Sequence, residues 1–113
     1  MQRKIWLSFD LGVRGDYEGM YAWLDEHQAI ECGDNVAHVV YQFSGELIES
    51  LKADLSAEVE IDNKKTRIYV IWQDPDTRST KGRFIFGKRK ASSWTGYAAS
   101  SSADDSSDSS DES

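Results

Sequence analysis

Basic and aromatic residues lie close together near the C-terminal end of this 113-residue chain, and the combination suits nucleic acid. Residues 77–98 contain six bases and no acid. Cationic side chains pair with phosphates, and aromatic rings stack on bases. The candidate nucleic-acid-binding residues are Arg83, Lys88, Arg89, Lys90 and Trp94. The net charge is −7, and removing the five acids after residue 98 leaves −2, so strong nonspecific binding is not expected.

Two histidines are candidates for acid–base chemistry, because imidazole titrates near neutral pH. His38 is the stronger candidate, since the predicted sheet places it on the same face as Ser8. A structural role is the alternative for both His27 and His38. The only cysteine, Cys32, cannot form an intramolecular disulfide, and the N-terminus has no long apolar run. We therefore expect a cytoplasmic protein with no membrane partner.

Alternating apolar and polar residues predict the strands, and apolar residues at helical spacing predict two amphipathic helices. The expected strands are 5–10, 36–43, 67–73 and 83–88, with a short additional strand at 29–32. The expected helices are 17–28 and 45–57, and their expected N-caps are Asp16 and Ser44. In the last strand, alternation places Phe84 and Phe86 on the same face.

The order of these elements predicts an α+β fold. Right-handed crossovers place both helices on one face of an antiparallel sheet of four or five strands, which is a ferredoxin-like sandwich. The opposite face is then uncovered and carries Trp6, Ser8, His38, Val40, Tyr69 and Ile71. Such an apolar face predicts a homodimer, with Trp6, Val40, Tyr69 and Ile71 forming the dimer face.

The composition divides the chain into three parts. Residues 1–91 form the folded domain, and residues 92–98 carry Trp94 and Tyr97, which indicates a segment that docks on another surface. Residues 99–113 are rich in Ser and Asp, and are expected to be a disordered acidic tail. The tail serves either solubility or competition with phosphates at the basic end.

Several segments together resemble a known family. They are the strand Ile5-Trp6-Leu7-Ser8-Phe9-Asp10, a Tyr-containing first helix, the strand 36–43 leading directly into a Leu-rich helix, and Arg67-Ile68-Tyr69-Val70 after an acidic turn. Over residues 4–73 the chain resembles the small CRISPR-associated dimeric endoribonuclease family and the related virulence-associated protein D ribonucleases.

The resemblance implies a role for Asp10, because the metal-binding Asp of that family stands at the end of the first strand. Two such carboxylates, one from each subunit, would hold a cation such as Mg²⁺ for phosphodiester hydrolysis. Phe9 stands where Tyr is common in the family. The alternative is structural, with the Asp10 carboxylate hydrogen-bonded to loop amides.

Two classes of function follow. The first is a small dimeric binding or scaffold protein that handles single-stranded RNA or DNA, or a protein partner. The second is a metal-dependent endoribonuclease or nuclease-like toxin, with Asp10 and His38 as catalytic residues and Mg²⁺ as the cofactor. We place binding first, because one carboxylate per subunit is a minimal catalytic site.

Overall fold

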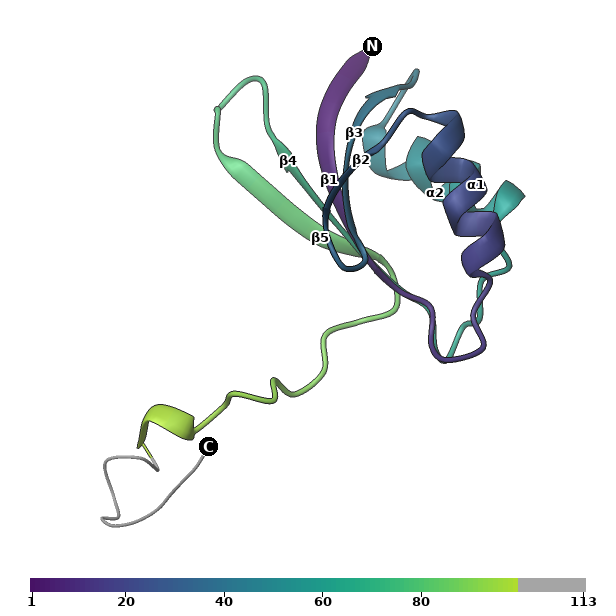
Figure 1. The fold of residues 1–113 in the computed structure, drawn as a ribbon. Helices are drawn as coiled ribbons and strands as arrows, with labels where there is room; N and C mark the ends of the chain where they lie inside the picture. The colour runs from purple at the N-terminus through teal and green to yellow at the C-terminus, as the bar shows by residue number, and fades with distance from the viewer. Residues whose placement is uncertain (100–113) are drawn as a thin grey trace.

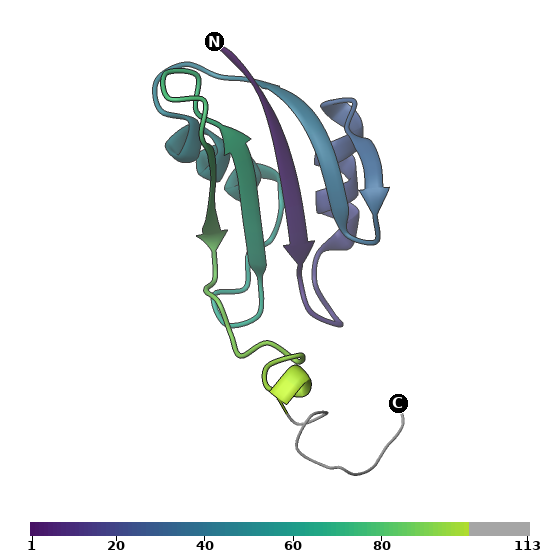
Figure 2. The ribbon, with the colours of Figure 1, turned by 90° about the vertical axis from the view of Figure 1, so that its left-hand side faces the viewer.

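The computed structural model describes residues 1–99 as an antiparallel sheet with two helices on one face (Figure 1). The elements are β1 (Gln2–Asp10), α1 (Tyr17–Glu26), β2 (Ile30–Gly33), β3 (Val36–Gln42), α2 (Leu47–Glu58), β4 (Arg67–Gln73) and β5 (Thr80–Phe86). A short helical turn follows at residues 97–99. The five strands have the order β2-β3-β1-β4-β5. Figure 2 looks onto the face of the sheet that the helices leave uncovered.

The hydrophobic core lies between the helices and the sheet. Ile5 and Leu7 of β1 are completely buried, while their neighbours along the strand are exposed. This alternation follows from the two-residue period of a strand. The helices contribute Met20, Trp23, Leu47, Leu51 and Leu55 to the same core. The core therefore fixes β1 as the central strand, between β3 and β4.

The predicted helix ends need two corrections. Asp16 is the N-cap of α1, as predicted, and its carboxylate accepts a hydrogen bond from the Gly19 amide. Ser44 is not the cap of α2, because Gly45 has a φ of 82° and Glu46 occupies the cap position. Helix α1 ends at Glu26, two residues before the predicted end, because Gln28 has a left-handed φ of 56°.

The predicted faces of the last strand are also wrong. Strand β5 begins at Thr80 rather than Arg83, and its register with β4 shifts by one residue. Phe84 pairs with Tyr69, whereas Phe86 pairs with Ile68. Because Ile68 and Tyr69 are successive strand residues, the two phenylalanines lie on opposite faces. A β-bulge causes this change of face.

The C-terminal segment leaves the sheet after β5 and extends away from it (Figures 1 and 2). Trp94 and Tyr97, which were expected to dock on a surface, are each 73% exposed. The expected acidic tail, apart from residue 99, lies outside the described residues. Within residues 1–99, none of the helices combines the length and apolar character needed to cross a membrane.

Candidate nucleic-acid interface

Side chains from neighbouring strands meet on the uncovered face of the sheet, which we call the open face. Trp6 pairs with His38 on one side and Ile71 on the other. Ser8 pairs with Tyr69, which in turn pairs with Phe84. Residues directly opposite each other share a face, so these pairs form two rows. The open face comprises Trp6, Ser8, His38, Val40, Tyr69, Ile71 and Phe84.

The centre of the open face is apolar and accessible. The Trp6 and His38 rings lie with their centroids 4.9 Å apart, at an interplanar angle of 54°. Trp6 is 38% exposed and Val40 is 42% exposed. The indole therefore presents ring surface that a planar ligand can cover.

Two arginines lie beside an aromatic pair at one end of this face. The Tyr69 and Phe84 rings are nearly perpendicular, with centroids 4.8 Å apart. The Arg89 guanidinium lies 5.7 Å from the Tyr69 centroid and 5.5 Å from the Phe84 centroid. Arg67 lies 5.7 Å from the Phe84 centroid on the same face. These are cation–π distances, so the aromatic rings help to position both cations.

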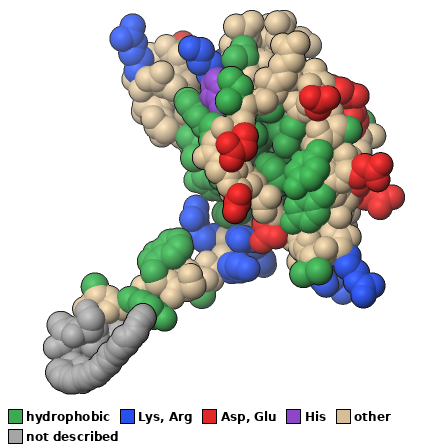
Figure 3. All heavy atoms as spheres, in the orientation of Figure 1, with side chains coloured by type: hydrophobic (Ala, Val, Ile, Leu, Met, Phe, Trp, Pro, Cys, Tyr) green, Lys and Arg blue, Asp and Glu red, His purple; other side chains and the backbone are tan. Residues whose placement is uncertain are grey.

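These four residues, together with Ser8 and Asp10, line a pocket of about 270 Å³, which we call the arginine pocket. Two guanidinium groups and one carboxylate, that of Asp10, meet aromatic surface here. Lys and Arg side chains gather at the end of the sheet from which the C-terminal segment departs (Figure 3). The pocket therefore suits a ligand with both an anionic group and a planar ring.

The Asp10 carboxylate already forms an ion pair and a hydrogen bond. It lies 3.9 Å from the Arg67 guanidinium and accepts a hydrogen bond from the Gly12 amide at 3.1 Å. In the part of the chain that the structure describes, no three His, Cys, Asp or Glu side chains are grouped closely enough to hold a metal ion. The surroundings of Asp10 within one chain therefore do not fit a complete Mg²⁺ site.

Gly82 is required by the position of Tyr69. A Cβ atom on Gly82 would lie 2.5 Å from the Tyr69 hydroxyl oxygen and 2.8 Å from a ring carbon. The Tyr69 ring thus lies directly over the β5 backbone. This contact fixes the ring beside Phe84 and Arg89.

The structure separates the predicted nucleic-acid-binding residues. Arg89 lies on the open face, whereas Arg83 pairs with the buried Val70 and faces the helix side. Lys88 and Lys90 are exposed beyond the end of β5. Trp94 is 73% exposed and belongs to the segment after β5, and this segment extends away from the sheet (Figure 1).

The other predicted site residues are placed as follows. His38 lies beside Trp6, with the two rings tilted, and does not line the arginine pocket with Asp10. The four residues predicted as a dimer face lie on the open face. Sequence reasoning missed Arg67 and Phe84 as site residues. Alternation along 67–73 already placed Arg67 with Tyr69. Phe84 lies opposite Tyr69 through the regular β4–β5 pairing that precedes the bulge, and the sequence does not specify this register.

The comparisons identify no relatives: no family model, no curated protein and no solved structure matches this chain.

Proposed function

We propose that the open face binds single-stranded nucleic acid and that the protein is a binding module. The arginine pocket carries this proposal, because it joins two guanidinium groups to the Tyr69–Phe84 pair, close to the exposed Trp6. Nonspecific single-strand binding uses this combination of phosphate contacts and aromatic stacking. Neither α1 nor α2 covers the open face (Figure 2).

The proposed fold class is the ferredoxin-like sandwich with one additional strand. The order β1-α1-β2-β3-α2-β4 and the sheet order β2-β3-β1-β4 support it, with β5 added at the edge beside β4. An open four-stranded sheet with aromatic residues on its central strands is also the arrangement by which common RNA-binding modules stack bases. This likeness is one of architecture alone.

The spacing of the rings suits successive nucleotides. Tyr69 lies two residues before Ile71, the direct partner of Trp6, so Trp6 and Tyr69 are diagonal neighbours. Diagonal side chains on a sheet are about 7–8 Å apart. In the proposed complex one base stacks on Trp6 and the next on Tyr69. Arg67 and Arg89 contact the phosphates beside them.

Binding is favoured over hydrolysis at this site. Asp10 already pairs with Arg67, and a cation bound to Asp10 would have to approach that guanidinium. The nuclease implied by the family resemblance requires a second carboxylate from another subunit. Cleavage of RNA that needs Mg²⁺ and is lost in Asp10→Asn would overturn the assignment as a binding module.

Fluorescence anisotropy of a labelled ten-nucleotide RNA, at 50 mM salt without Mg²⁺, tests the proposal. Trp6→Leu and Tyr69→Leu should each weaken binding, because stacking contributes about 1–3 kcal/mol per base, or about 5- to 150-fold. Tyr21→Leu is the matched control, because Tyr21 is an exposed aromatic residue on α1, on the opposite side of the sheet. Equal affinity of all three variants would refute the proposal.

The oligomeric state separates this proposal from the homodimer expected from sequence. Light scattering should give a monomer when the RNA is bound to the open face. A stable dimer that is disrupted by Trp6→Leu and does not bind RNA would assign the open face to a second copy of the chain instead.

A further inference from the structure

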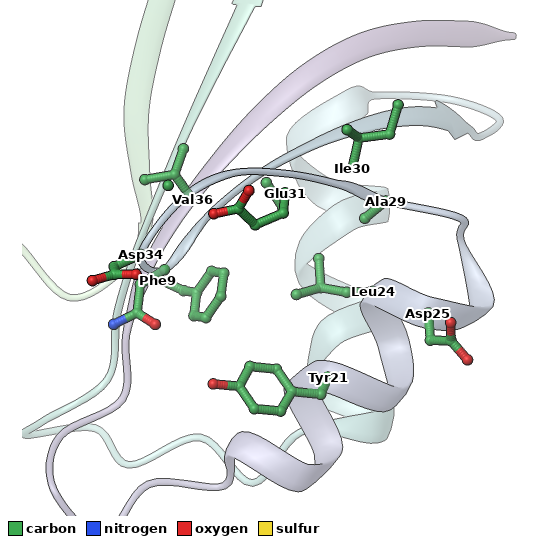
Figure 4. Close-up of a pocket in the computed structure, with 12 residues that line it drawn as sticks. Phe9, Tyr21, Leu24, Asp25, Ala29, Ile30, Glu31, Asp34 and Val36 are labelled. Carbon is green, nitrogen blue, oxygen red and sulfur yellow. The ribbon is translucent and has the colours of Figure 1, made fainter.

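A second and larger pocket lies on the helix side of the sheet. It has a volume of about 580 Å³ and lies between α1 and the β2–β3 hairpin (Figure 4). Phe9, Tyr21, Leu24 and Ala29 give it an apolar wall. The Phe9 and Tyr21 rings meet edge to face, with centroids 6.5 Å apart. Its size falls in the range of small-ligand sites.

Acidic side chains supply the charge of this pocket. Asp25, Glu31 and Asp34 are among its twelve lining residues, which include no Lys, Arg or His. Glu31 extends from β2 toward Phe9, while Asp34 and Asp25 lie toward opposite ends (Figure 4). The space-filling view shows a hydrophobic hollow with acidic side chains on both sides (Figure 3). The pocket therefore complements a positive charge carried on an apolar body.

The three carboxylates do not suggest an inorganic cation. A metal ion needs oxygen ligands that converge on one point, and the described residues contain no such group. The carboxylates here are instead distributed around aromatic and aliphatic surface. An aromatic wall attracts ammonium and guanidinium groups through the face of the ring.

We propose that this pocket binds an organic cation, namely an ammonium or guanidinium group on an aliphatic stem. The stem packs against Tyr21, Leu24 and Phe9, and the cationic group pairs with Glu31 and Asp34. The site is independent of the proposed nucleic-acid interface, because it opens on the other side of the sheet.

Two sources can supply this chemistry, a free amine or a Lys or Arg side chain of a protein. The position of β2 is relevant to the second source. Strand β2 is at the edge of the sheet, so one side of its backbone has no neighbouring strand among the described residues. An extended peptide can pair with such an edge and direct alternate side chains to one face. Glu31 pairs with the buried Ala37, so the side chain opposite it on an added strand would face the pocket side.

Nitrogen–proton NMR spectra of the full chain test the proposal with three probes. The probes are pentylamine, the capped peptide acetyl-Val-Arg-Val-amide, and pentanol as the neutral control for pentylamine. Pentylamine or the peptide should shift the amide signals of Tyr21, Leu24 and residues 29–36 at millimolar concentration, and pentanol should bind at least about tenfold more weakly. A greater affinity for the peptide, with shifts at the outer amides of β2, would identify a protein segment as the source. Stronger binding of pentylamine would identify a free amine.

Charge variants complete the test. The double variant Glu31→Gln, Asp34→Asn keeps the shape of the pocket and should weaken cation binding by about tenfold or more. The double variant Glu18→Gln, Glu49→Gln removes the same charge from exposed helix positions outside the pocket and should leave binding unchanged. Either of two results would overturn the proposal: no shifts with both cationic probes, or the same weakening in both double variants. Neither result would affect the proposed RNA binding of the open face.

Discussion

Arg83 and Arg89 offer a direct test of the proposed interface. Both are exposed cations near the end of the fold, and the sequence places both in one basic region. The structure puts Arg89 over Tyr69 and Phe84, whereas Arg83 pairs with Val70 and faces the helix side. We therefore expect Arg89→Ala to weaken RNA binding and Arg83→Ala to have little effect, although each removes one positive charge.

The size of the effect follows from the counterions that nucleic acid releases. For a single strand, each phosphate contact contributes about 0.7 to the slope of log affinity against log salt concentration. The salt concentration changes by about 1.3 decades between 1 M and 50 mM. If the contact contributes nothing at 1 M salt, its loss lowers the affinity at 50 mM by about eightfold. Arg83→Ala should change the affinity by less than about twofold, because its charge acts only at a distance through screened solvent.

The measurement is anisotropy of a labelled ten-nucleotide RNA between 50 and 200 mM salt. Only Arg89→Ala should reduce the salt slope, by about 0.7. Thermal unfolding followed by circular dichroism checks that both variants remain folded. Equal losses of affinity and slope in the two variants would refute the assignment of the open face, and would indicate attraction by net charge alone.

Three further predictions concern stability and the tail. Gly19→Ala should lower the free energy of unfolding in urea, although Ala is usually better in helices by about 1 kcal/mol, because a Cβ here would contact the Asp16 carboxylate and the Glu58 carbonyl. Burial raises the pKa of Tyr41 to about 12, which favours the neutral phenol that hydrogen-bonds Asp54 in the native state. Its stabilising contribution is therefore complete below pH 10 and is lost as pH rises from 10 to 12. The free energy of unfolding in urea should therefore fall more between pH 9 and pH 11 in the natural protein than in Tyr41→Phe. Removing residues 100–113, which carry five acids and no base, should tighten RNA binding at 50 mM salt and have no effect at 1 M salt, as anisotropy would show.

The central strands were predictable because the alternation of residue types in their sequences matches the alternation of buried and accessible side chains. In β1, β3 and β4, buried residues alternate with exposed or half-buried ones, and a period of two has no helical alternative. The orientation of α1 was less predictable. Tyr17, Met20, Tyr21 and Leu24 recur at helical spacing and predict an apolar stripe, yet Tyr21 is 54% exposed, and Trp23 is buried instead. Helical spacing allows either of two neighbouring rows of side chains to face the core. The packing of Trp23 near Tyr41 selects one of these rows.

The position of Arg89 could not be predicted from the sequence. Three consecutive cations after a strand are usually a solvated end, and nothing in their order distinguishes the middle one. Gly87 has a φ of 76°, which favours glycine, and a Cβ at this position would lie 2.6 Å from the Thr66 carbonyl oxygen. The chain can therefore change direction closely against β4 at this point. Arg89 then reaches the Tyr69 and Phe84 rings.

The bulge between β4 and β5 links the stability of the fold to the proposed site. With regular alternation, Phe84 and Phe86 would both lie on the open face, and only Ile85 between them would point into the core. With the shift in register, Ile85 is buried and Phe86 packs against the core, while Phe84 lies beside Tyr69 on the open face. The core thus anchors the strand that carries the exposed ring. Because Arg67 and Arg89 both lie against the Phe84 ring, the strand that the core anchors also positions the two cations of the arginine pocket.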